Sequence, residues 1–403
     1  MTSIERLFQP RLAFLIVLAL AMSQYAVLAI SIGKGSPDFV LGGDFVAFWS
    51  AAREILAGNL ISLYTPDGLD AAIQTHRPGV NVTGLTWQYP PHASLVFSPI
   101  GYLPYSVAYA LWCGIGLAVF TTVLISIGLN GRFLIAVLAT IPVLIALNTG
   151  QNALFTGSLM LIAVCYAKPR PVLAGLAVGL LTIKPQLGIL LPVFFIASGY
   201  WRAFFTAALV SIALCGWSYL VTGSESWMAF FAYLGVISGS VAEGIMPLFK
   251  MVNVLSAARL AWLPEIIAFA LAGLSVAASI FAVIWTSRKT EDARWHYAVM
   301  ATATLLATPY SMYYELVLLV PALAFVVLQG VRTHWLSWER ESIAALMFIS
   351  LVLPGPATQI GISLGFVICV GVSLIVFRRL RRVITDGRPS AEKMAQQSRN
   401  PAI

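Results

Sequence analysis

The chain has 403 residues, of which 59% are hydrophobic and only 10% are charged, and its mean hydropathy is +0.88. A soluble domain carries about 25% charged residues, so this composition excludes an ordinary soluble fold. The net charge of +8 is explained by basic cytoplasmic loops of a membrane protein, and we expect no nucleic-acid partner.

Apolar runs recur along the chain at lengths typical of membrane helices, which need roughly 20 residues to cross a bilayer. The first run, Leu12–Ile32, lacks a small-residue cleavage site, so we interpret it as a retained span and not as a signal peptide. Because several runs are short, we predict an all-α polytopic membrane protein with ten to twelve transmembrane helices. The predicted spans lie near 12–33, 105–128, 133–147, 154–167, 171–183, 186–198, 203–221, 263–286, 296–308, 314–329, 342–354 and 360–377.

The lysines and arginines alternate between the predicted loops. With the N-terminus in the cytoplasm, 18 of the 24 basic residues fall in cytoplasmic segments, as in bacterial-type plasma membrane proteins. We therefore predict one integral-membrane domain over residues 1–385, with both termini cytoplasmic and a disordered tail at 386–403. The six basic residues assigned to the outer side or to depth in the membrane are Lys34, Arg53, Arg77, Lys184, Lys250 and Arg259.

Two predicted outer segments are long, at about 33–105 and 222–262. The first contains the stretch LGGDFVAFWSAAREILAG, from Leu41 to Gly58, whose apolar residues fall on one helical face. This pattern predicts an extracytoplasmic amphipathic helix that lies in the bilayer interface. Asp44 occupies its N-cap position, where the carboxylate either caps the helix or takes part in chemistry at the outer surface.

Six stretches, taken in order over roughly residues 38–330, resemble glycosyltransferase family 87 of the GT-C superfamily. They read GGDFVAFWSAAREILAG, LYTPDGL, WQYPPHASLVFSPIGYLPYSVAYALW, NTGQNALFTGSLML, LAGLAVGLLTIKPQLGILLP and TPYSMYYELVLLVPALAF. The family includes mannosyltransferases that elongate phosphatidylinositol mannosides.

The resemblance implies a GT-C-type fold with its active site on the extracytoplasmic face and a polyprenyl-phosphate-linked sugar, often mannose, as donor. It places the family's general base at Asp44 and its IKP lysine at Lys184. The family often has a histidine in its late block, which is absent from residues 308–315 here, so that role cannot be carried over. Glu315 matches an acidic position of some relatives.

Glycosyl transfer needs a base for the acceptor hydroxyl and a group that stabilises the departing phosphate. The predicted topology brings the polar candidates to one membrane face. For the donor phosphate and lipid we predict Lys184, His92 and Tyr310; for the sugar or acceptor we predict Gln151, Asn152, Glu315, Trp87 and Tyr89.

All of these residues except Tyr310 also have a structural interpretation. Lys184 could snorkel at a helix end, and Glu315 could pair with it or be an ordinary outer-face carboxylate. Gln151 and Asn152 could form a polar turn, and His92 could be structural. Trp87 and Tyr89 could belong to the aromatic belt of the membrane interface.

The sequence shows no DxD motif and no cluster of metal ligands. The simplest prediction is therefore an inverting, metal-independent hexosyltransferase without a cofactor, working among membrane lipids on a glycolipid or glycan acceptor. The alternatives are a transporter or flippase of lipid-linked sugars and a glycan polymerase or ligase. We find no internal repeat of the kind common in transporters, and few outer arginines that could clamp a pyrophosphate.

Overall fold

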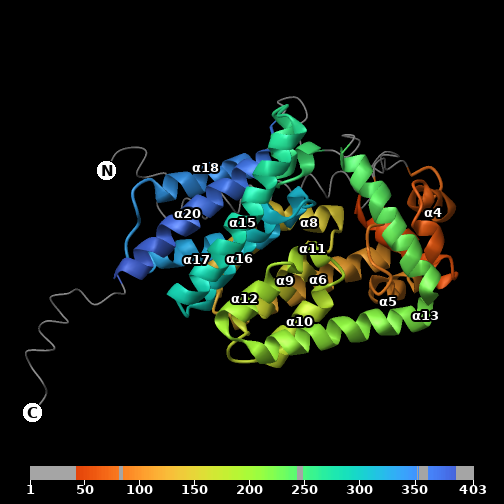
Figure 1. Ribbon diagram of the computed structural model, residues 1–403, viewed down its shortest axis with the longest axis horizontal. Helices are drawn as coiled ribbons and strands as arrows, with labels where there is room; N and C mark the ends of the chain where they lie inside the picture. The colour runs from red at the N-terminus through yellow and green to blue at the C-terminus, as the bar shows by residue number, and fades with distance from the viewer. Residues whose placement is uncertain (1–41, 81–84, 243–247, 352, 354–361, 387–403) are drawn as a thin grey trace, which may run out of the picture.

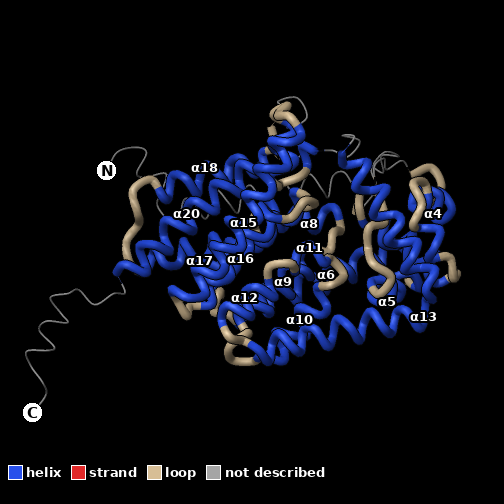
Figure 2. The backbone as a smooth tube through the Cα atoms, in the orientation of Figure 1, coloured by secondary structure: helices blue, strands red, loops and turns tan. Residues whose placement is uncertain are grey.

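The structure, a computed structural model, describes residues 42–80, 85–242, 248–351, 353 and 362–386. Every regular element in these ranges is a helix (Figures 1 and 2), which confirms the predicted all-α class. Figure 1 shows the C-terminal helices on one side of the molecule and the helices of the first outer segment on the other. The predicted first span and the residues of the tail after Asp386 lie outside the described ranges.

In the part of the chain that the structure describes, four helices are long and apolar enough to cross a membrane. They are α6 (Tyr105–Ser126), α13 (Trp201–Ala242), α15 (Glu265–Lys289), and η4 with α17 (Tyr313–Leu318 and Leu319–Arg332). A further pair, α7 (Gly131–Leu138) and α8 (Ile141–Thr149), would add a span across a bend of 52°. The chain is therefore a multi-pass membrane protein.

Within the described residues, several of the other predicted spans fold as helices shorter than the roughly 20 residues that a bilayer requires. The shorter or more charged helices are α9 (Ala153–Cys165), α10 (Pro171–Leu181), α11 (Pro185–Gly188), α12 (Leu191–Ser198), α16 (Ala293–Ala307), α18 (Glu339–Leu351) and α20 (Leu364–Asp386). The remaining elements are short: α3 (Phe45–Leu56), η1 (Leu60–Leu63), α4 (Gly68–His76), α5 (Ala93–Phe97), η2 (Ser98–Tyr102), η3 (Leu248–Lys250) and α14 (Val254–Leu260).

Helix α13 joins the predicted span 203–221 to the second outer segment. It bends at Gly223, whose φ of 77° is one that glycine adopts without strain. Beyond the bend, the helix runs beside the first outer segment (Figure 1), where Phe230 packs edge-on against Tyr64 with ring centroids 5.7 Å apart. The start of the second outer segment is thus a helix that covers the first.

Helix α3 carries the amphipathic pattern, and the aromatic residues of its apolar face are covered by protein. Phe45, Phe48 and Trp49 are 0%, 2% and 6% exposed. The Phe48 ring stacks on Phe97 at 5.0 Å, and the Trp49 indole N–H donates to the Leu103 carbonyl at 2.9 Å. The aromatic residues that were expected to face the bilayer interface therefore pack against protein, because an apolar helix face shows that something covers it and not what does.

The start of α3 is locked to the end of α8. The Asp44 backbone N–H donates to the Thr149 carbonyl at 3.0 Å, and the Trp112 indole donates to the Gly150 carbonyl at 3.0 Å. Gly150 ends α8 with φ +66°, and a Cβ there would lie 2.5 Å from the Cβ of Phe45. This close approach fixes the position of Asp44 relative to the residues that follow α8.

We expect Gly150→Ala to destabilise the protein more than the matched change Gly199→Ala. Gly199 also ends a helix with positive φ, +71°, but a Cβ there meets no atom within 4 Å among the described residues. Gly199→Ala should cost about 1 kcal/mol for the backbone conformation, and Gly150→Ala a further ~1–3 kcal/mol for the collision with Phe45. Thermal unfolding of both variants in one detergent measures this difference, and equal shifts would show that the contact with Phe45 is not tight.

Candidate active site

A polar cavity of about 110 Å³ opens where the start of α3, the segment 85–89, Gln151 in the turn after α8, the start of α11, η3 and η4 meet. Its lining comes from segments far apart in the sequence. Six of the nine residues predicted for the site line it: Asp44, Trp87, Tyr89, Gln151, Lys184 and Tyr310. Most of the residues predicted for the site therefore do lie together around one cavity.

Asp44 is half-buried and does not cap α3. Its side chain makes no capping hydrogen bond, and its Oδ2 instead accepts a hydrogen bond from Gln151 Nε2 at 2.8 Å. Burial raises the pKa of Asp44, and the Gln151 hydrogen bond together with the charges of Lys250 and Lys184 offsets part of that rise. The capping alternative thus fails, and what remains is a carboxylate on a cavity wall with more than ordinary basicity.

Lys184 and Glu315 form a buried ion pair. Lys184 is 5% exposed and Glu315 is 2% exposed, and Lys184 Nζ lies 3.0 Å from Glu315 Oε1. The second carboxylate oxygen accepts the Met312 backbone N–H at 3.1 Å, and Nζ lies 5.0 Å from the centroid of the Tyr314 ring. Lys184 therefore does not snorkel, and of the predicted alternatives for Glu315 the structure shows the pairing.

Gln151 and Asn152 carry acceptor atoms that no described residue satisfies. Asn152 Nδ2 donates to the Tyr89 hydroxyl at 3.1 Å, while Gln151 Oε1 and Asn152 Oδ1 are buried without a hydrogen-bond partner among the described residues. Such unpaired atoms cost free energy unless a ligand or water pairs them. Burial raises the pKa of Tyr310 to about 12 and that of Tyr89 well above its ordinary value, so both hydroxyls stay protonated and can donate.

His92 lies outside the cavity lining. Its Nε2 is 3.1 Å from the Thr182 hydroxyl, its ring stacks on Trp227 at 6.0 Å, and burial lowers its pKa. Asn152 and Glu315 are absent from the lining too, and they lie one layer back, behind Tyr89 and Lys184.

Lys250 is the charged lining residue that was not predicted for the site from the sequence. It is exposed and comes from η3, in the second outer segment. An isolated antiparallel bridge between Met251 and Met312 brings it to the cavity. Its one signal in the sequence is that it is a basic residue on the predicted outer side. Among the described residues, no three His, Cys, Asp or Glu side chains lie close enough together to hold a metal ion.

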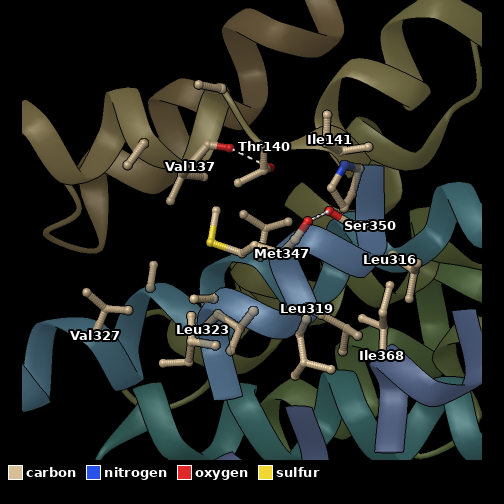
Figure 3. A pocket seen from close by; sticks show the side chains of 18 of the residues that line it. Val137, Thr140, Ile141, Leu316, Leu319, Leu323, Val327, Met347, Ser350 and Ile368 are labelled. Carbon is tan, nitrogen blue, oxygen red and sulfur yellow. Dashed lines mark hydrogen bonds between the residues drawn. The ribbon is translucent and has the colours of Figure 1, made fainter. Parts of the chain in front are cut away.

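A second cavity, of about 330 Å³, is bounded by α7, α8, α17 and α18 (Figure 3). Its lining is almost entirely hydrocarbon, and the hydroxyls of Thr140 and Ser350 bond to the carbonyls of Val137 and Met347 within their own helical segments. The segment of η4 and the start of α17 borders both spaces: its tyrosines line the polar cavity, and Leu316 and Leu319 line the apolar one.

Comparison with known proteins gives one match, to the family model of glycosyltransferase family 87 over residues 87–309. No curated protein and no solved structure matches. The matched range covers more than half of the chain and includes Gln151, Lys184 and Lys250, while Asp44 precedes it and Glu315 follows it. With its multi-pass helical architecture, this chain belongs to glycosyltransferase family 87 and is a membrane glycosyltransferase.

Proposed function

We propose that the protein moves a hexosyl residue, with mannose as the first candidate, from a polyprenyl-phosphate donor to a lipid or glycan acceptor, with Asp44 as general base. One observation carries this proposal. The Asp44 carboxylate makes no cap to its own helix and faces a cavity that is also lined by two lysines. A base and cations at one small polar site are the groups that glycosyl transfer from a phosphate donor requires.

In the proposed step, the oxygen of an acceptor hydroxyl attacks the anomeric carbon as its proton passes to the Asp44 carboxylate. The new glycosidic C–O bond forms while the bond between the anomeric carbon and the phosphate oxygen breaks, and the electron pair of that bond stays on the phosphate. A single displacement of this kind inverts the anomeric configuration, and the step uses neither a metal nor a cofactor.

The unpaired oxygen of Gln151 supports a sugar as the ligand. Gln151 lines the cavity, so its Oε1 can accept a hydrogen bond from a sugar hydroxyl after a small side-chain movement, and the protonated hydroxyls of Tyr89 and Tyr310 can donate. Asn152 lies one layer back and orients the Tyr89 hydroxyl, to which its Nδ2 donates. Trp87 is 1% exposed and packs 5.0 Å from the Tyr89 ring, so we propose that it supports Tyr89 and does not stack on the sugar over a broad face.

The apolar cavity supports a lipid-linked donor. A prenyl chain needs a hydrocarbon surface close to the site that binds its phosphate, and the segment around η4 borders both kinds of space. We place the site on the extracytoplasmic face of a bacterial-type plasma membrane, with both termini cytoplasmic, on the strength of the alternating basic residues in the sequence. Family membership favours transfer over the alternative of a flippase.

Substitution of Asp44 tests the base directly. Asp44→Asn and Asp44→Ala should lower the rate of transfer from polyprenyl-phosphate-mannose roughly a hundredfold or more, because neither side chain can take up the acceptor proton. The matched control is Asp70→Asn, an exposed carboxylate in the same outer segment that does not line the cavity. Folded Asp44 variants that transfer sugar at the wild-type rate would remove Asp44 from the mechanism.

The pH profile tests the environment of Asp44. The base must be ionised, so kcat/KM should fall as the pH drops through the Asp44 pKa, and burial places that fall above the ordinary range of an aspartate. Gln151→Leu removes a hydrogen bond that lowers this pKa, so the acidic limb should move to higher pH. Steady-state kinetics across pH measure the shift in Gln151→Leu, with Asp70→Asn as the control that should not shift. If the acidic limb of Gln151→Leu stays at the wild-type pH, Asp44 does not set the acidic limb.

A further inference from the structure

The two lysines of the polar cavity have unequal electrostatic surroundings. Lys184 is buried, and the Glu315 carboxylate balances its charge at 3.0 Å. Lys250 is exposed, and no carboxylate of the described residues lies within ion-pair distance of its ammonium. Its closest ring contact is Phe249, with Nζ 5.9 Å from the centroid. The cation of this cavity that is held in no ion pair among the described residues is therefore Lys250.

Lys250 also lies within electrostatic range of the proposed base. Both lysines lower the pKa of Asp44, and the effect of Lys250 is the larger of the two. Since Asp44 and Lys250 line the same small cavity, a ligand that places its reacting carbon near the carboxylate has its leaving group within reach of this ammonium.

The backbone that carries Lys250 is held in place. Met251 pairs with Met312, and the Val252 N–H donates to the Ser311 carbonyl at 3.0 Å. The Met312 N–H in turn donates to the second oxygen of Glu315. Glu315 thus holds Lys184 with one oxygen and, with the other, the segment against which the backbone of Lys250 is fixed.

The charge of the donor changes during transfer. A polyprenyl phosphosugar is a phosphodiester with one negative charge, and its phosphate gains a second charge as the bond to the anomeric carbon breaks. A cation that no protein carboxylate already balances gains most from this developing charge.

Resting on the proposed function, we propose that Lys250 binds the phosphate of the lipid-linked donor and stabilises it as it leaves. Lys184, together with Glu315, acts as a positioning pair for the wall that carries Lys250. The step is the displacement described above, with the electron pair of the broken C–O bond remaining on the phosphate that Lys250 contacts.

Binding of citronellyl phosphate, a short prenyl phosphate, tests this assignment without turnover. The full chain is placed in phosphatidylcholine nanodiscs and titrated by calorimetry. Lys250→Gln should weaken binding about tenfold or more, because one charged hydrogen bond is lost. Lys250→Arg should stay within about threefold of wild type because it keeps the cation. Lys168→Gln, which removes an exposed lysine paired with Glu291, is the control and should bind as wild type does.

Two further arms separate the sources of phosphate. Inorganic phosphate shares the charge but lacks the prenyl chain. It should compete with citronellyl phosphate for binding to wild type, and it should no longer compete in Lys250→Gln. Replacing part of the phosphatidylcholine by phosphatidylglycerol tests for a lipid headgroup. If Lys250→Gln changes only the response to phosphatidylglycerol and binds citronellyl phosphate normally, Lys250 is a membrane contact and the assignment is overturned.

This binding test does not depend on which sugar the protein transfers. Wild type that binds citronellyl phosphate through Lys250 but transfers no mannose would support the phosphate site and count against the proposed donor sugar. Wild type that transfers sugar while Lys250→Gln binds citronellyl phosphate as tightly would overturn the role of Lys250 and leave the proposed function in place. Failure of wild type to bind citronellyl phosphate at all would also overturn it.

Discussion

The arrangement of the polar cavity depends on the buried ion pair between Lys184 and Glu315, which joins positions 131 residues apart in the chain. Burying two charges is costly, and such a pair persists only where each partner satisfies the other and the remaining lone pairs are bonded. Here the second oxygen of Glu315 accepts the Met312 N–H. Removal of either partner would leave an uncompensated charge in the wall of the cavity.

Two neighbouring hydrogen bonds reinforce the wall that contains this pair. The Thr308 hydroxyl donates to the Gln186 carbonyl at 2.9 Å, and Asn253 Nδ2 donates to the Pro309 carbonyl at 3.0 Å. The first of these ties α11 to the segment before η4, and the second ties that segment to the start of α14. One wall of the cavity is therefore a hydrogen-bonded unit, and the opposite wall, with Asp44, is fixed by the lock between α3 and α8.

The shared border of the two cavities fits a substrate with two chemical parts. A lipid-linked sugar combines a polar head with a hydrocarbon chain, and a protein that binds it needs both kinds of surface within the length of one molecule. The segment of η4 and the start of α17 meets that need, because its tyrosines lie on the polar side and Leu316 and Leu319 on the apolar side. The buried Glu315 between them fixes the segment in place.

The sequence by itself determined the helical membrane class and the family, because low charge, long apolar runs and a set of ordered motifs do not depend on how helices pack. It also predicted six of the residues that line the polar cavity. It also placed Asp44 at the head of α3. Only the tertiary structure decided what covers α3, since an apolar face is the same against lipid and against aromatic rings. Packing also set how many runs are long enough to span, moved His92 away from the cavity, and brought in Lys250. These outcomes depend on contacts between residues far apart in the chain, such as Met251 with Met312, which no local pattern records.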